Sequence, residues 1–147
     1  MCCIVDAFSR RIVGWTAASN MKTQMVLDAL EMARRSRGNH RLVGLVAHSD
    51  AGSQFTSVSF AETLALEGIA ASIGSVGDAY DNALAESTIG LFKNEAIRDG
   101  SPFRHGPLRT IDDVEWVTTG WIDWYNARRL HSTLGDVPPD EFEAAYY

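Results

Sequence analysis

The feature that most constrains the fold is an apolar run, Leu42–Ala47, which is followed at once by the polar and small residues HSDAGSQFT. The run has no polar alternation, which is typical of a strand buried on both faces of a largely parallel sheet. In open α/β sheets, ligands bind beyond the carboxyl ends of such strands, and Asp50 stands at that end. The pattern therefore predicts a buried strand that presents a carboxylate to a ligand site.

Other patterns place helices and strands around this strand. Apolar runs over residues 2–8 and 11–18 flank Ser9-Arg10 and predict an antiparallel hairpin, with Asp6, Ser9 and Arg10 forming its turn. Helical spacing and end signals predict helices over Thr23–Arg37, Ser59–Gly68, Ala83 to about Ile97 and Thr110 to about Arg129, and a short strand over Ala70–Ile73. GSVGDAYDN is expected to be a loop. The order indicates an α/β core over residues 1–100, with a helical extension of the same core over residues 101–147.

Length and charge narrow the classes of function. A chain of 147 residues fits one domain with a real core. The net charge of −6 argues against a general nucleic-acid coating protein, which is usually basic. Residues 1–48 hold seven Lys or Arg against three acids, whereas residues 49–147 hold six against sixteen. Contact with nucleic acid is therefore expected to be local and assisted by metal.

The N-terminal sequence and the cysteines give weaker indications. MCCIV has no basic leader and no cleavage site, so we expect no signal peptide, no membrane span and a cytoplasmic protein. Cys2 and Cys3 are adjacent and are interpreted as buried strand thiols. The four histidines are scattered without the spacing of a metal site.

A second carboxylate follows at a distance that suits a shared cation. Residues 51–85, 35 in all, separate Asp50 from Glu86. A carboxylate from a strand end and one from a helix can converge on hard cations, which need oxygen ligands. Gly90 and Lys93 follow Glu86 by four and seven residues, so all three share one helix face. This helix face offers a stripe with a carboxylate, a gap without a side chain and an ammonium group. Such a surface is suited to contact with a polynucleotide.

Several ordered motifs carry a resemblance to a known family. HSDAGSQFTS, GDAYDNALAES followed by LFKNE, and WYNARRLHSTLG resemble the integrase-type catalytic core of bacterial insertion-sequence transposases, the DDE type, which is related to retroviral integrases. The similarity runs from DAFSRRIVGW to the final residues, and the spacing of 35 is a hallmark of that core. Together these motifs are highly specific.

The resemblance implies a fold and a set of site residues. The fold is a ribonuclease H-like mixed sheet with flanking helices, and the site is a triad of two aspartates and a glutamate that holds two Mg²⁺ or Mn²⁺ ions. Asp50 matches the second aspartate and Glu86 the glutamate, so both are the implied catalytic and metal-binding residues. The implied DNA-binding residues are Asn82 in the YDN turn, Lys93, and the RRLH residues Arg128, Arg129 and His131.

The implied function is DNA transposition by metal-dependent phosphodiester cleavage and strand transfer. In two-metal phosphoryl transfer one ion activates the attacking water or 3′-hydroxyl and the other stabilises the leaving oxygen. The expected partners are transposon ends, target DNA and further copies of the chain, with no membrane and no small-molecule substrate.

One element of the family pattern has no match in this sequence. The first aspartate of the triad lies on a strand before the hairpin, whereas Asp6 matches the D-x-F-S-R turn. We therefore expect an N-terminally incomplete core without its central strand, two of three metal carboxylates, impaired catalysis, and self-association or marginal stability. The alternative is a degenerate remnant that binds DNA or an intact transposase without catalysis. A structure-selective nuclease would not need the YDNALAES and WYNARRLHSTLG signatures.

Structural roles remain open for most of these residues. Asp50 could cap a turn, Glu86 could favour a helix dipole, and Lys93 could be a solvated lysine. Arg128 and Arg129 could complement a helix end, and the three arginines of the 22–37 helix are expected to face solvent. The four tryptophans are interpreted as packing residues, not as base-stacking platforms: Trp15, Trp116, Trp121 and Trp124.

Overall fold

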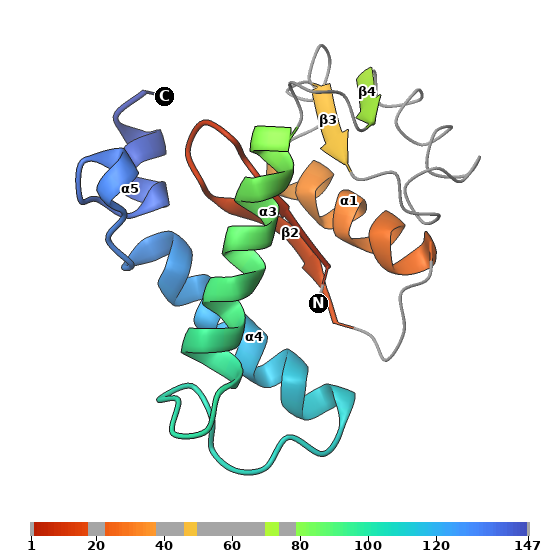
Figure 1. The fold of residues 1–147 in the computed structure, drawn as a ribbon, viewed down its shortest axis with the longest axis vertical. Coiled ribbons are helices and arrows are strands. Elements are labelled where there is room, and N and C mark those ends of the chain that lie inside the picture. The colour runs from red at the N-terminus through yellow and green to blue at the C-terminus, as the bar shows by residue number, and fades with distance from the viewer. Residues whose placement is uncertain (1, 18–22, 38–45, 50–69, 74–78, 147) are drawn as a thin grey trace.

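The computed structural model describes residues 2–17, 23–37, 46–49, 70–73 and 79–146 (Figure 1). Its elements are β1 (Cys2–Val5), β2 (Ile12–Thr16), α1 (Thr23–Arg37), β3 (Val46–Ser49), β4 (Ala70–Ile73), α3 (Ala79–Phe92), η3 (Lys93–Ile97), α4 (Ile111–Ala127), η4 (Ser132–Leu134) and α5 (Pro139–Ala144). The helix predicted over residues 59–68 lies outside the described residues. In this part of the chain, no helix is long and apolar enough to cross a membrane.

The predicted hairpin is confirmed. β1 and β2 pair antiparallel, with Cys2 opposite Thr16 and an irregularity after Ile4. Oδ1 of Asp6 accepts hydrogen bonds from the backbone N–H groups of Phe8 (2.8 Å) and Ser9 (3.0 Å), which is a typical aspartate-stabilised turn.

Helix α1 packs directly on the hairpin, in the order that the sequence predicted. Its apolar face forms a core cluster with the first strand: Cys2, Met25, Val26, Ala29 and Leu30. Gly14 of β2 allows this approach, because a Cβ there would lie 2.1 Å from the backbone oxygen of Ala29. The close packing of α1 on β2 therefore depends on a missing side chain.

A second core cluster surrounds Trp121, which is fully buried. Its ring contacts Phe92 at a centroid distance of 5.4 Å and Tyr125 at 5.1 Å. Ile12 of β2 belongs to the same cluster, so the hairpin and the C-terminal helix share one core. The prediction for Trp116 was wrong, because its side chain is 68% exposed. Trp116 lies on the outer face of α4, since the adjacent Val117 already faces the core.

Strands β3 and β4 form a parallel pair with Val46 opposite Ala70. The predicted strand Ala70–Ile73 is confirmed, whereas the strand predicted at Leu42–Ala47 is described at Val46–Ser49. Among the described strands, β1–β2 and β3–β4 are separate two-stranded sheets. The fold is thus mixed helix and sheet, and the prediction of a missing central strand stays a prediction.

The helix that carries Glu86 begins earlier than predicted, at Ala79, so the YDN residues are helical and not a loop. It ends as an α-helix at Phe92, and η3 continues it with π-helical geometry. Figure 1 shows α3, in green, beside the hairpin. Helix α3 contacts β1 and β3.

The C-terminal part is helical, as predicted. The capping box of α4 is confirmed: Thr110 Oγ1 accepts from the Asp113 N–H at 3.2 Å, and Asp113 Oδ2 accepts from the Thr110 N–H at 3.0 Å. Past α4 the chain turns at Gly135, with φ 79°, and α5 returns to the hairpin turn (Figure 1). The domain boundary at residue 100 stays a prediction.

Candidate active site

One predicted catalytic carboxylate, Glu86, lies on a helix that contacts the strand directly before the other, Asp50. Glu86 lies on α3, and α3 contacts β3, whose last residue, Ser49, directly precedes Asp50 in the sequence. Asp50 itself lies outside the described residues, so the separation of its carboxyl group from that of Glu86 stays a prediction. Glu86 is exposed.

The stripe predicted on α3 faces solvent. Glu86 and Lys93 are exposed, and a Cβ added to Gly90 would meet nothing within 4 Å. The opposite side of the helix is buried at Thr88 and Phe92. The three stripe residues therefore form an open surface with no side chain at its middle position.

Buried contacts fix α3 close to Glu86. Thr88 is 1% exposed, and its Oγ1 donates to the Leu84 carbonyl at 2.9 Å. Burial raises the pKa of Tyr125, which keeps the phenol neutral. Asn82 also lies on α3, although its side chain is outside the described part of the chain.

The two arginines at the end of α4 have different surroundings. Arg128 is exposed, and its side chain has no hydrogen bond or ion pair among the described residues. Arg129 instead donates from Nη2 to Glu95 Oε2 at 2.9 Å and from Nε to Glu95 Oε1 at 3.1 Å. Burial acts to raise the pKa of Glu95, but hydrogen bonds from Arg129 and from the Trp121 indole outweigh it and lower the pKa. The Arg129 guanidinium is therefore engaged with protein.

His131 is buried, with 8% of the residue exposed. Its ring stands edge-on to Tyr125 at 4.6 Å, and its Nε2 has no hydrogen-bond partner in the described part of the chain. Burial lowers the pKa of His131, and the positive charge of Arg129 lowers it further. Its backbone oxygen accepts from the N–H groups of Leu134 (3.0 Å) and Asp136 (2.9 Å), so His131 anchors the turn before α5.

The donor chemistry of the site suits a hard cation. Asp50 and Glu86 offer carboxylate oxygens, which Mg²⁺ and Mn²⁺ prefer. Glu86 is exposed and has no ion-pair partner among the described side chains, so it is free to ligate. Within the described ranges, no three His, Cys, Asp or Glu side chains form a metal-binding group.

Comparison with known families identifies the chain. A family model described as "Integrase core domain" matches residues 1–79, and a second model of the same description matches residues 67–139. The chain belongs to the integrase core family. The resemblance inferred from the sequence motifs is thereby confirmed.

Similar proteins include transposases. The chain is 52% identical over 147 residues to the "Putative transposase for insertion sequence element IS986/IS6110" of Mycobacterium tuberculosis H37Rv, covering 98% of this chain and 51% of that protein. It is 47% identical over 144 residues to the transposase for insertion sequence element IS629 of Shigella sonnei, covering 98% of this chain and 46% of that protein. The chain thus spans about half the length of these relatives.

A solved structure supports the fold. A chain of the simian T-cell lymphotropic virus intasome, solved with the PP2A regulatory subunit B56 gamma, superposes with a TM-score of 0.71 over 94% of this chain and 45% of that chain, at 16% sequence identity. The integrase core fold, which is ribonuclease H-like, is therefore shown for this chain at the level of overall architecture.

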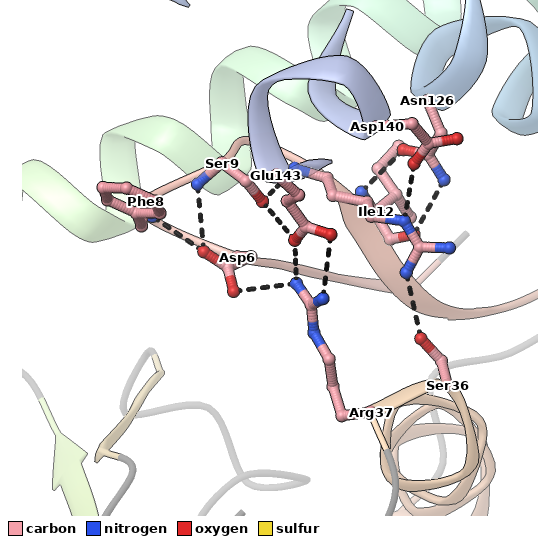
Figure 2. Close-up of polar contacts among 10 residues, drawn as sticks. Asp6, Phe8, Ser9, Ile12, Ser36, Arg37, Asn126, Asp140 and Glu143 are labelled. Atoms are coloured by element: carbon pink, nitrogen blue, oxygen red, sulfur yellow. Dashed lines mark hydrogen bonds and ion pairs between the residues drawn. The ribbon is translucent and has the colours of Figure 1, made fainter. Parts of the chain in front are cut away.

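Three polar residues with a structural role in the fold were not predicted from the sequence. Glu95 lies within LFKNE and Asn126 within WYNARRLHSTLG, but these motifs indicated no structural role for either residue. Asn126 accepts from the Ile12 N–H at 2.9 Å and donates to the Ile12 carbonyl at 3.0 Å (Figure 2). Arg37, which was expected to face solvent, instead pairs with Asp6 at 2.9 Å and with Glu143. Their partners lie far away in sequence, so local patterns gave no signal.

Proposed function

We propose that this chain is the catalytic core of a transposase that cleaves DNA and joins it to a target by metal-dependent phosphodiester chemistry. The observation that carries the proposal is the open stripe on α3: Glu86, the bare Gly90 and Lys93 face solvent on a helix that contacts β3, the strand directly before Asp50. The family membership and the transposase relatives support the same reaction.

Each residue of the site has a proposed task. Asp50 and Glu86 hold Mg²⁺ or Mn²⁺, in the two-ion site expected of the family's complete core. When bound, the ions activate the attacking hydroxyl and stabilise the leaving oxygen. Lys93 binds a DNA phosphate beside them, and Gly90 leaves room for the DNA backbone. Asn82 and Arg128 are proposed as further contacts to DNA at transposon ends or target.

Arg129 and His131 stay predicted DNA contacts, but the structure favours a different role for both. The Arg129 guanidinium forms an ion pair with Glu95, and the His131 ring is buried against Tyr125. Contact of either side chain with DNA would require breaking these interactions. We therefore propose that both act on DNA indirectly, by holding the segment that carries Arg128.

The 147 residues supply two of the family's three metal ligands. We propose that this polypeptide, tested alone, binds Mg²⁺ weakly and transfers strands poorly, because one carboxylate fewer lowers the affinity for a hard cation. Robust Mg²⁺-dependent nicking of a transposon-end duplex by these residues alone would contradict this. Function as an oligomer on DNA ends is part of the same proposal.

Mn²⁺ binding to the 147-residue chain tests the site directly. Free Mn²⁺ is followed by electron paramagnetic resonance for the wild type and for the variants Asp50→Asn and Glu86→Gln. We expect each variant to weaken binding by roughly tenfold or more, because each removes a charged ligand. Glu115→Gln, an exposed acid on α4, is the matched control and should bind as the wild type does. Equal binding by all four proteins would refute the site.

A further inference from the structure

Helix α3 changes its geometry at Lys93. Residues Lys93–Ile97 form η3, a π-helical turn in which the Arg98 N–H donates to the Lys93 carbonyl at 3.1 Å, five residues back. Such turns are rare, and inside α-helices they occur frequently at functional sites. Lys93 is the first residue of this turn and the last residue of the stripe. The conformation of η3 therefore determines the position of the Lys93 side chain.

Glu95 fastens this turn to the protein at several points. Its Oε1 accepts from the Trp121 indole N–H at 3.2 Å, and its carboxylate receives the two-pronged Arg129 pair. Its backbone oxygen accepts from Ser101 Oγ at 2.7 Å, and Ser101 is buried. The next residue, Ala96, is fully buried.

Lys93 contrasts with these fixed neighbours. It is exposed, and its side chain has no partner among the described residues. Only one residue separates it from Glu95, whose backbone and carboxylate are both held. Lys93 is therefore a cation without a partner among the described side chains, next to a turn that is held by several hydrogen bonds.

We propose that Glu95 is a positioning residue, which holds η3 so that Lys93 projects from the same face as Glu86 and Gly90 and can bind a phosphate of the DNA end. The inference rests on the proposed function, since it assigns Glu95 a task at the DNA face of that site. Glu95 itself does not contact DNA; it acts through Lys93.

Charge alone makes the opposite prediction for a Glu95 substitution. An acid two residues from a DNA-binding lysine repels phosphate, so removing it would tighten DNA binding if long-range electrostatics decided the outcome. Replacing Glu95 would also release the Arg129 guanidinium, a further gain for binding. A loss of affinity on neutralising Glu95 is therefore a sign that positioning dominates.

A double-mutant cycle on the 147-residue chain tests the proposal. The wild type, Glu95→Gln, Lys93→Ala and the double variant are titrated onto a fluorescently labelled duplex with a transposon-end sequence, by anisotropy at several KCl concentrations. We expect Lys93→Ala to lower the salt slope by about one, as for a lost phosphate contact. Glu95→Gln should weaken binding roughly three- to tenfold, and the double variant should be no weaker than Lys93→Ala alone.

Two further variants control for charge and folding. Asp140→Asn also removes one negative charge and breaks an ion pair, that of Arg11 at 2.8 Å, on α5. It should leave the salt slope unchanged, and the affinity should be unchanged or slightly tighter. Arg129→Lys keeps the charge but loses the two-pronged geometry, and should show a partial loss that also disappears without Lys93. If Glu95→Gln does not give a native circular dichroism spectrum, Arg129→Lys takes its place in the cycle.

The outcomes separate this inference from the proposed function. Additive losses in the double variant, or tighter binding by Glu95→Gln, would overturn the positioning role while leaving the DNA face intact. If the wild type does not bind the duplex, or if Lys93→Ala changes neither affinity nor salt slope, the proposed DNA face fails and the positioning role falls with it.

Discussion

The surroundings of Cys2 and Cys3 control the pKa values and the reactivity of their thiols. Both lie on β1, under α1 and the Trp121 cluster. Burial raises the pKa of Cys2, and it raises the pKa of Cys3 to about 12. Because the thiolate is the reactive form, neither thiol is suited to redox or nucleophilic chemistry in the folded chain.

This burial predicts a difference in thiol reactivity. At pH 8, Ellman's reagent should label Cys3 of the native chain about a thousandfold more slowly than in denaturant, where the pKa returns to about 8.5. Cys2→Ser isolates the Cys3 signal, and Cys3→Ser isolates that of Cys2. Labelling of the native chain at the denatured rate would show that β1 is open to solvent.

Between elements, α1 and β2 approach each other closely at Gly14. This approach places the backbone oxygen of Ala29 where a side chain at residue 14 would begin. The backbone of a helix cannot retreat in the way that a flexible side chain can. The hairpin and α1 must therefore separate if residue 14 gains a Cβ.

Alanine at two glycines tests this contact. Gly14→Ala should destabilise the chain by about 1–3 kcal/mol or more, because it overpacks the interface between β2 and α1. Gly120→Ala on α4 is the control: its Cβ would meet only a Phe103 side-chain atom at 3.8 Å. It should be neutral or stabilising by up to about 1 kcal/mol, because alanine favours the helix. Urea unfolding followed by circular dichroism measures both, and equal effects would contradict the steric argument.

Across the whole molecule, Arg37 joins segments from both ends of the chain. Its guanidinium at the end of α1 binds Asp6 in the hairpin turn and Glu143 in α5, and Ser9 Oγ donates to Glu143 Oε1 at 2.7 Å (Figure 2). The side chains of Arg37 and Glu143 are only 16% and 14% exposed. The cluster thus fastens the C-terminal helix to the hairpin.

The Glu143 cluster predicts a dependence of stability on pH. Burial acts to raise the pKa of Glu143, but hydrogen bonds from Arg37 and Ser9 outweigh it, so the folded-state pKa lies below its ordinary value. A depressed carboxyl pKa contributes stability above the unfolded pKa, about 4.3, and this is lost as pH falls through the folded pKa.

Substitution at Glu143 checks this dependence. At pH 7, Glu143→Gln should lower the free energy of unfolding by about 1–3 kcal/mol, because it leaves Arg37 without its main partner. The difference from wild type should shrink below about pH 4. Glu141→Gln, an exposed acid of the same helix, should change stability by less than about 0.5 kcal/mol. A constant difference between pH 3 and 7 would refute the assignment.

Local signals accounted for most of the described elements. The Asp6 turn, the Thr110–Asp113 capping box and the apolar spacing of α1 each involve residues a few positions apart, so sequence alone predicted them. The start of α3 was predicted wrongly: the helix begins at Ala79, within the stretch whose composition predicted a loop.

For the candidate site too, the sequence predicted some features and could not show others. The order and spacing of its motifs indicated the family, and the resemblance to that family implied the roles predicted for Asp50, Glu86 and Lys93. The sequence could not show that Glu95 pairs with Arg129, because the two residues are 34 positions apart.

By itself, the sequence determined that this chain is an integrase core, because the ordered motifs that resemble the family are short stretches of consecutive residues. Only the tertiary structure decided which polar side chains face solvent and which are held inside. Periodicity gives the apolar side of each element, but the partner of a buried charge depends on which elements pack together. For that reason the side chains of Lys93 and Arg128 have no hydrogen bond or ion pair among the described residues, whereas Arg37 and Arg129 are paired with carboxylates and His131 is buried.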